Sequence, residues 1–394
     1  MALLLNEEQT MLRDSARSFL ADPAPVAQLR QLRDRGDASG MARDTWSAFC
    51  ELGYAGVLVG DAHGGAGLGA VEMGELMQQI GRHLSALPFL SSAVVAARLL
   101  QGAGSAAQQA HWLPRIGSGE TIAALALDEG AKHRPEHIAL RADRIEHAAG
   151  SGWRLSGAKT FVPDGHVASL LLVAARCDDG VAVFALPPQT SGVLVERSVM
   201  CDAHDAARVT LHDVRLADAA RLPRSGDHTL RQALDWGRAA AAAELLGIAD
   251  EVFERTLDFM KQRKQFGRLI GEFQALQHRA ALLYIEIELA RAALAQALYA
   301  LNALNALNAD HDTAASDELP DAGSDTANES VAIAKAKCGS VATLAVQEAV
   351  QLHGGMGMTD QLDFGLFMAR ARVLQELFGD TAFHTDRLAR LRGY

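Results

Sequence analysis

Two short segments carry residue types that suit a ligand with phosphate groups. The first is Arg263-Lys264-Gln265-Phe266-Gly267, which follows a long apolar-striped stretch. An arginine fork can bind a pyrophosphate through two parallel N–H bonds. The second is Gln351-Leu352-His353-Gly354-Gly355, whose glycines allow a backbone to approach a phosphate or ribose closely. The two segments together suit a dinucleotide.

Each segment also has a simpler interpretation. Arg263 can be a solvated basic residue that complements the dipole at the end of a helix. Gly354 and Gly355 can be a plain C-terminal helix cap, which is the commoner role of such a pair. His353 and His384 could suggest a metal, but no second ligand has a usable spacing, so we expect no metal site.

The elements that must position these residues follow the order helical, β, helical. Asn6 and Gln9 have the spacing of a capping box, and helical apolar patterns continue to about residue 120. Short apolar or alternating runs then occupy residues 121–225, at 121–127, 153–162, 169–175, 181–186, 193–197 and 208–214. Asp178-Asp179-Gly180 separates two of these runs as a hairpin turn would. Residues 226–394 are again helical in pattern.

These patterns predict an α+β protein with three domains. They are an N-terminal helical domain (1–120), a central antiparallel β domain (121–225) and a C-terminal four-helix bundle (226–394). Within the last domain we expect helices from 273 to about 305 and from 331 to 352. The acidic segment 310–330 between them contains no Lys or Arg and is expected to be a solvated loop.

Composition excludes several classes of partner. The net charge of −11 offers no broad basic surface for a nucleic acid. The four cysteines form no C-x-x-C pair, and free thiols fit a reducing compartment. The chain has neither a signal-peptide pattern nor an apolar run long enough for a membrane span. We therefore expect a cytoplasmic protein.

The ordered set of motifs resembles the acyl-CoA dehydrogenase family. The similar segments are the two described above, with Gln274 after the first, and further ones at 6–9, 51–54, 64–69 and 155–161, so the resemblance spans nearly the whole chain. It implies an FAD-dependent oxidoreductase of lipid metabolism that desaturates an acyl-CoA and passes electrons to electron-transferring flavoprotein. Its cofactor contacts would be Arg263, Phe266, Gln274, Gln351, Gly354, Gly355 and Thr381, with the two main segments reaching the FAD of a neighbouring subunit.

The catalytic base of the family has no clear counterpart in this chain. A carboxylate must sit at the substrate α carbon in a dry pocket, where its pKa can rise. The family glutamate falls on Gly379, and Asp380 is shorter and one position over. An alternative family position falls on Gly237, beside Arg238, and Glu244 is two turns away, where we expect an unremarkable polar residue. The resemblance leaves Arg238 and the Gly379 N–H as candidate contacts to the thioester.

The family segments that hold the flavin ring are also altered. Asp128-Glu129-Gly130-Ala131-Lys132-His133 stands where the family has a threonine and a Gly-Ser turn. Phe161 can still pack on a ring. Pro163 replaces a threonine, and it has no N–H or hydroxyl to donate.

Three functions remain open at this point. The first is a subunit without its own base, paired with a base-carrying paralogue in a hetero-oligomer, as in two-gene dehydrogenases of the family, many of which act on bulky thioesters such as steroid side chains. The second is a self-sufficient homo-oligomer with Asp380 as the base. The third is a non-catalytic binding or scaffold protein, which would never take up flavin.

Overall fold

The computed structural model describes residues 4–22, 25–147, 150–312 and 321–394. The chain divides into two compact units, each described by itself below. Unit 1 comprises Met1–Arg30, Ala70–Ser85 and Arg238–Tyr394, and unit 2 comprises Gln31–Gly69 and Ala86–Gly237. The three sequence-based domains stay a prediction.

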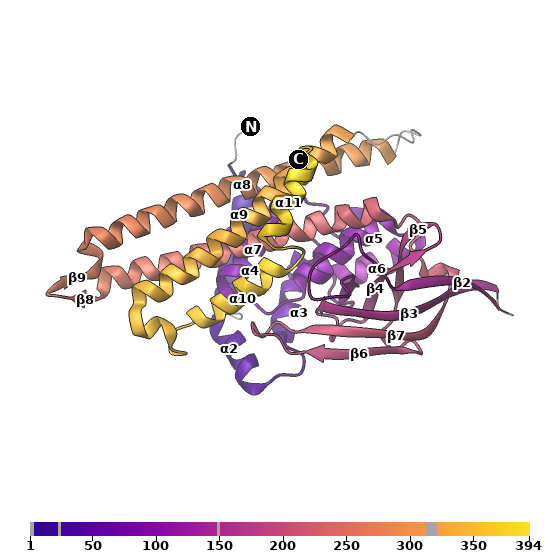
Figure 1. Cartoon of the computed structure of the whole chain (residues 1–394), viewed down its shortest axis with the longest axis horizontal. Coiled ribbons are helices and arrows are strands. Elements are labelled where there is room, and N and C mark those ends of the chain that lie inside the picture. Colours follow the sequence, from indigo (N-terminus) through magenta and orange to yellow (C-terminus); the bar gives the residue numbers. More distant parts are fainter. Residues whose placement is uncertain (1–3, 23–24, 148–149, 313–320) are drawn as a thin grey trace. The chain divides into compact units, whose positions relative to one another are not determined.

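Unit 1 is helical. It contains most or all of seven long or medium helices: α1 (Glu7–Ala21), α4 (Ala70–His83), α7 (Asp227–Gln262), α8 (Gln274–Asp312), α9 (Asp321–His353), α10 (Phe364–Glu376) and α11 (Thr381–Leu391). Helices α8 and α9 lie side by side, and α10 and α11 pack on α9 (Figure 1). The predicted capping box at the first helix is confirmed, because Asn6 Oδ1 accepts from Gln9 N and Gln9 Oε1 accepts from Asn6 N.

Helices α4 and α7 approach each other until backbone meets backbone. A Cβ built on Gly81 of α4 would lie 2.1 Å from the Glu244 carbonyl oxygen of α7. A Cβ built on Gly247 of α7 would lie 2.1 Å from the Gln78 carbonyl oxygen of α4. Real side chains cannot approach a backbone oxygen this closely, so each helix requires glycine where the other crosses it.

Unit 2 joins short helices to one sheet. The helical pieces include α3 (Arg43–Glu51), the π-helical stretch Phe89–Ala96, α5 (Ala97–Ala103) and α6 (Ala106–Gly117), and α2 (Val26–Arg35) begins before the unit boundary. The strands are β1 (Ala123–Ala126), β2 (Arg141–His147), β3 (Gly150–Pro163), β4 (Leu170–Cys177), β5 (Gly180–Leu186), β6 (Val193–Ser198) and β7 (Ala206–Ala217). Within the described residues the sheet order is β1-β4-β2-β3-β7-β6, with β5 paired to β4.

The sheet agrees with the predicted runs in most places and differs in two. The hairpin at Asp178-Asp179-Gly180 is confirmed, since β4 and β5 pair in antiparallel register from Cys177 and Gly180 outward. However, β1 pairs with β4 in parallel, so the sheet is mixed and not purely antiparallel. Strand β2 was missed because its sequence alternates charged residues with few apolar ones, so it lacks the hydrophobic pattern of a strand.

The helical ends also correct the sequence-based loop. Helix α8 extends to Asp312 and α9 already begins at Asp321, so residues 310–312 and 321–330 are helical and not loop. Residues 313–320 lie outside the described part of the chain. Acidic side chains are favourable in the first turns of a helix, because they complement its dipole, and this explains how an acidic stretch can start α9.

The glycine crossing gives a stability test. Gly247→Ala should lower the free energy of unfolding by about 1–3 kcal/mol, because the new methyl group overpacks the α4–α7 contact. Gly102→Ala is the matched control, since Gly102 lies in α5 and nothing is within 4 Å of its built Cβ. It should be neutral or stabilising. Urea denaturation that finds both variants equally stable would contradict the backbone contact.

Candidate functional site

The two sequence segments with phosphate-binding character meet in unit 1. Helix α7 ends at Gln262, and a small hairpin of β8 (Lys264–Gln265) and β9 (Arg268–Leu269) leads through the turn Ile270–Glu272 to α8. Helix α9 ends at His353 and continues as the 3-10 turn Gly354–Met358. The two chain reversals form one pocket of about 650 Å³.

The lining of this pocket contains five of the predicted cofactor residues. They are Arg263, Phe266, Gln351, Gly354 and Gly355. Gln274 is exposed at the first position of α8, next to the lining residue Ala275, but it does not line the pocket itself. Thr381 lies elsewhere, at the start of α11, and its hydroxyl has no hydrogen-bond partner among the described residues.

The backbone geometry at the tip of the hairpin is unusual. Phe266 has a φ of 51° and Gly267 a φ of 81°, both in the left-handed region. Two successive left-handed residues are typical of a tight two-residue hairpin turn, and they are unfavourable for a bulky side chain such as phenylalanine. The Phe266 ring meets the ring of Phe273 edge-on, at a centroid distance of 6.2 Å. The residue is still 91% exposed, so burial of its ring does not offset the unfavourable conformation of its backbone.

The inner wall of the pocket is apolar and aromatic. Met260, Ile270 and Leu352 form a small buried cluster below it, with Phe259 and Phe273 packed against the cluster. Such a floor suits the flat face of a base or ring. A ligand with both rings and phosphates therefore finds an apolar surface and an arginine in one place.

His353 is a structural part of this wall. Its ring stacks on Phe259 at a centroid distance of 4.1 Å and lies 4.4 Å from the ring of Phe364. Its Nδ1 lies 2.8 Å from the Ala349 carbonyl oxygen. Burial lowers the pKa of the imidazole below its ordinary value. Within the described ranges no group of three metal-ligating side chains occurs.

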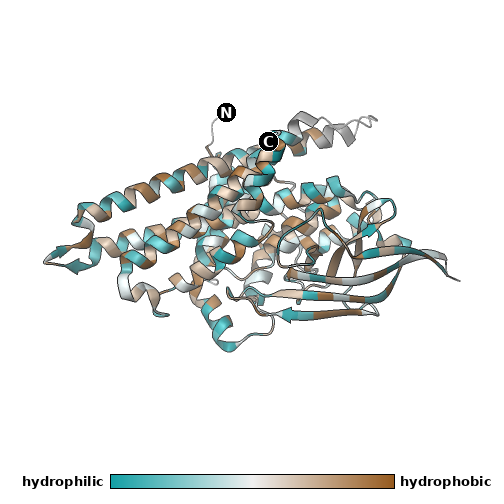
Figure 2. Ribbon diagram, viewed as in Figure 1, coloured by the Kyte–Doolittle hydropathy of each residue, from teal (hydrophilic) through white to brown (hydrophobic). Residues whose placement is uncertain are grey.

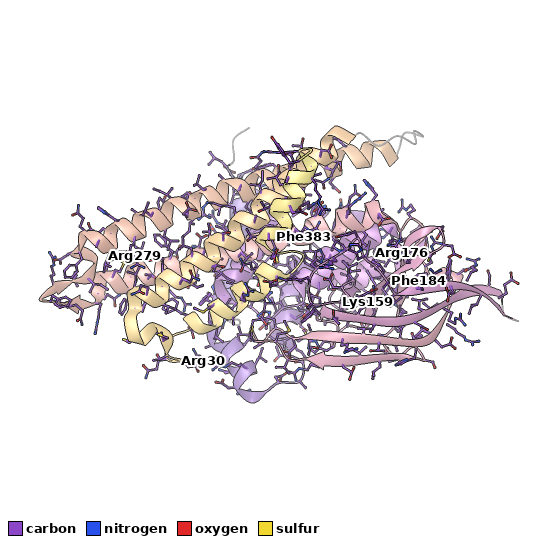
Figure 3. All side chains as sticks on the ribbon, in the orientation of Figure 1. Arg30, Lys159, Arg176, Phe184, Arg279 and Phe383 are labelled. Atoms are coloured by element: carbon purple, nitrogen blue, oxygen red, sulfur yellow. The ribbon has the colours of Figure 1, made fainter. Side chains whose placement is uncertain are left out.

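An ion pair that the sequence analysis missed closes one side of the pocket. Arg279 of α8 lines the pocket and binds Glu348 of α9 through Nε and Nη2, at 2.7 and 2.9 Å (Figure 3). The two residues are 69 positions apart in the chain. No local spacing signal could have found such a pair.

A second set of predicted residues meets in the loop between α10 and α11. Arg238 of α7 is buried, and its Nε donates to the Phe378 carbonyl oxygen at 3.1 Å. The structure thus brings the predicted substrate contacts Arg238 and Gly379 together. Gly379 itself is buried, with a φ of 107° that favours glycine.

The surroundings of Gly379 leave little room for a side chain. A Cβ built on Gly379 would lie 2.3 Å from a ring carbon of Phe383, in the first turn of α11 (Figure 3). The Gly379 N–H donates to the Glu376 carbonyl oxygen at 3.1 Å, so this donor already has an acceptor in the loop. This differs from the sequence-based expectation that the N–H is left for a thioester.

Asp380 has a structural role at the same place. It is the N-cap residue of α11, and its Oδ1 accepts a hydrogen bond from Phe383 N at 2.8 Å. Capping carboxylates stabilise the first turn of a helix and complement its dipole. The sequence offered this residue as a substitute base, and the geometry ties its carboxylate to the helix end.

Glu244 is not the unremarkable polar residue that the sequence suggested. It is fully buried in α7, and its two oxygens accept from Nε and Nη2 of Arg370 of α10, at 2.6 and 3.0 Å. A buried carboxylate is tolerated only when a cation and further hydrogen bonds satisfy it. The sequence could not show this pair, because 126 positions separate the two residues.

Unit 2 contains the altered ring-holding segments. Asp128 follows β1, and its carboxylate lies 3.0 and 3.1 Å from Nδ1 of His133. Lys159, which is fully buried, donates to the Leu127 carbonyl at 3.0 Å and to Glu129 at 2.7 Å (Figure 3). Phe161 keeps an exposed ring, and Pro163 ends β3 without a donor.

The chain matches two domains of one known family. Residues 6–120 match the acyl-CoA dehydrogenase N-terminal domain, and residues 224–391 match the acyl-CoA dehydrogenase C-terminal domain. The chain belongs to the acyl-CoA dehydrogenase family. A relative, acyl-CoA dehydrogenase FadE27 of Mycobacterium tuberculosis, is 29% identical over 375 residues, which cover 94% of this chain and 92% of the relative.

Two solved structures have the same fold as this chain. A variant of the Tcur3481-Tcur3483 steroid ACAD is 30% identical, with a TM-score of 0.82 over 98% of both chains. The ChsE4-ChsE5 complex from Mycobacterium tuberculosis is 24% identical, with a TM-score of 0.87 over 100% of both chains. The predicted α+β fold of the acyl-CoA dehydrogenase type is therefore confirmed.

The cofactor of the family is FAD, and the unit 1 pocket fits its dinucleotide part. Arg263 offers a guanidinium for the pyrophosphate, and the apolar wall offers a surface for adenine. Nothing lies within 4 Å of the built Cβ of Gly355, so its backbone is open to a ligand.

Across the described residues, no helix is long and apolar enough to span a bilayer.

The Glu244–Arg370 pair provides a test of the core around this site. Glu244→Gln should lower the free energy of unfolding by about 3–5 kcal/mol, because it leaves the Arg370 guanidinium buried without its counter-charge. Asp258→Asn is the control on the same helix, since Asp258 pairs with Lys261 at the exposed surface. Its effect should stay within about 0.5 kcal/mol. Both free energies of unfolding are measured by thermal and urea denaturation. If Glu244→Gln and Asp258→Asn lose the same amount of stability, the special role of the buried pair is refuted.

Proposed function

We propose that this chain is a subunit of an acyl-CoA dehydrogenase that contributes to FAD and substrate binding but has no catalytic base of its own. The observation that carries the proposal is Gly379. The resemblance to the family assigns the base glutamate to this position, and the ring of Phe383 fills the space that a side chain there would need.

The nearby carboxylates support the absence of a base. Asp380 caps α11 through the N–H of Phe383. Glu244 binds Arg370 with both oxygens. A general base must reach the proton that it removes and must be able to accept it. Both carboxylates instead hold the protein's own groups.

The hairpin between α7 and α8 supports a contribution to a neighbour's cofactor. Arg263 and Phe266 belong to this hairpin, and Gln351 of α9 lines the same pocket. Phe266 sits at the tip of a strained turn, and its edge contact with Phe273 leaves nearly the whole residue exposed. Its ring would gain burial and a ligand contact when a second subunit and its FAD lie against it.

An apolar face of α8 supports the presence of a partner. Leu282, Ile285 and Leu289 lie on one side of the helix, at helical spacing, and are 64%, 52% and 52% exposed. Both hydrophobic and hydrophilic residues occur along the α8 ribbon (Figure 2). The occupant we propose is a base-carrying paralogue. The name Tcur3481-Tcur3483 describes the 30% identical steroid enzyme as a pair, which favours a hetero-oligomer over a homo-oligomer.

The reaction would be α,β-dehydrogenation of an acyl-CoA. FAD, when bound, would accept the hydride that leaves the β carbon, the carboxylate of the base-carrying paralogue would take the α proton, and electron-transferring flavoprotein would take the electrons onward. The task of this chain is to orient the dinucleotide through Arg263 and the glycine turn, and to shape the thioester end of the site through the Arg238-bound loop. A bulky acyl group such as a steroid side chain is the substrate class suggested by the steroid relative.

The test is purification of the chain alone and together with a base-carrying paralogue from the same cell. The pair should be yellow and should oxidise an acyl-CoA, and the chain alone should do neither fully. Arg263→Met should weaken FAD binding by the pair about 10- to 100-fold, because a charge-assisted hydrogen bond contributes about 1.5–3 kcal/mol. Lys261→Met at the same helix end is the control, since Lys261 pairs with the exposed Asp258. Full colour and turnover of the single chain would refute the proposal.

The self-sufficient enzyme with Asp380 as base is the second candidate. It is favoured by the position of Asp380 next to Gly379, in the loop that also binds Arg238. It requires that Asp380→Asn abolish flavin reduction by an acyl-CoA while flavin content stays unchanged. If the variant reduces flavin at the wild-type rate, Asp380 is a cap and not a base. A preparation that stays colourless with every partner would favour the scaffold alternative.

A further inference from the structure

The loop between α10 and α11 is strained at two successive residues. Phe378 has a φ of 58° and Gly379 a φ of 107°. Left-handed backbone is unfavourable for a bulky residue, and such conformations persist only where the surroundings enforce them. The contacts that enforce this one can be identified in the structure.

A buried lysine of α9 and a buried arginine of α7 hold the backbone of this loop. Lys335 of α9 donates through Nζ to the Gln375 carbonyl at 3.1 Å and to the Gly379 carbonyl at 3.0 Å. Arg238 donates to the intervening Phe378 carbonyl. Both side chains are buried. Three carbonyls on either side of the strained bonds are therefore fixed to two rigid helices.

The chemistry of Lys335 is suited to holding carbonyls. Burial, and then the positive charge of Arg238, lower its pKa to about 7. A neutral amine keeps two N–H groups, and the two carbonyls need two, so the contacts are available in either protonation state. A buried lysine is costly in a core, which makes its presence here informative.

We propose that Lys335 is a positioning residue that, with Arg238, holds the Phe378–Gly379 loop in its left-handed form against Phe383. In this conformation the loop leaves no space for a side chain at residue 379. Its backbone also forms a fixed wall at the thioester end of the site. This last role rests on the function proposed above. Lys335 acts through the loop backbone and need not touch the substrate.

The contacts of Lys335 should determine how strongly Gly379→Ala destabilises the protein. Gly379→Ala should be strongly destabilising in the wild type, because alanine meets both the strained φ and the ring of Phe383. Removing the lysine donors with Lys335→Met releases two carbonyls and lets the loop relax. The loss of melting temperature caused by Gly379→Ala should then shrink to less than half. Two substitutions that share no such device lose stability additively.

Matched variants distinguish the coupling of Lys335 and Gly379 from a non-specific loss of stability. Lys337→Met changes a lysine on the same helix that pairs with Glu286 of α8. The effect of Gly379→Ala should be the same in that background as in the wild type. Phe383→Ala should relieve part of the loss directly, because it removes the clash. Where Lys335→Met does not fold, Lys335→Gln, which retains a shorter donor, takes its place.

The second measurement uses the flavin-loaded complex with its partner and a 3-thiaacyl-CoA, which cannot be oxidised at its β position. Lys335→Met should raise the dissociation constant of this ligand about tenfold or more at unchanged flavin content, since misplacement of a site wall by about 1 Å is costly. Lys337→Met should leave the constant unchanged.

The outcomes distinguish the two levels of the claim. Additive losses from Lys335→Met and Gly379→Ala would overturn the holding of the loop. Coupled losses with unchanged ligand affinity would overturn the positioning role. A complex that never takes up flavin would overturn the proposed function and leave the coupling of Lys335 and Gly379 to stand on the stability data.

Discussion

The contact between the backbones of α4 and α7 is the constraint on which the rest of unit 1 depends. Gly81 and Gly247 allow the two helices to touch, and this fixes α7 in both rotation and translation. Two side chains then project from α7 in fixed directions, and a third follows its last turn. Arg238 reaches the α10–α11 loop, Glu244 reaches α10, and Arg263 follows the last turn at the hairpin. A shift of α7 would move all of them at once.

The groups around the two candidate sites differ in how fully the protein itself binds them. Groups that suit a dinucleotide, an arginine, an exposed aromatic ring and two glycines, converge on one pocket. Carboxylates near the expected position of the base are satisfied by the protein's own cations and N–H groups. Ionisable side chains that are fully satisfied stabilise a fold, and those that must move protons need an accessible lone pair.

Much of the fold follows from sequence periodicity, and the parts that do not follow have physical causes. The helical pattern of α7 and the strands β3 to β7 were readable because buried residues recur with the period of each element. Strand β2 lacks that pattern, and the first ten residues of α9 contain three acidic residues and few apolar ones, so neither was predicted. The pocket was predictable from two motifs. The contacts of Glu244 with Arg370 and of Gly379 with Phe383 could not be predicted, because they depend on the folded arrangement and these residue types carry no local sequence signal.

The turn at the tip of the hairpin has one more consequence. Its path is set by a left-handed pair, and Gly267 satisfies the second position without cost. The first position makes few demands on the side chain, because the Phe266 ring touches Phe273 at its edge and is otherwise open to solvent. Evolution can therefore exchange the side chain at residue 266 while the hairpin keeps its shape. Asparagine would even reduce the strain of the left-handed backbone at this position. The binding specificity of the hairpin can therefore change in evolution without a change in the fold that supports it.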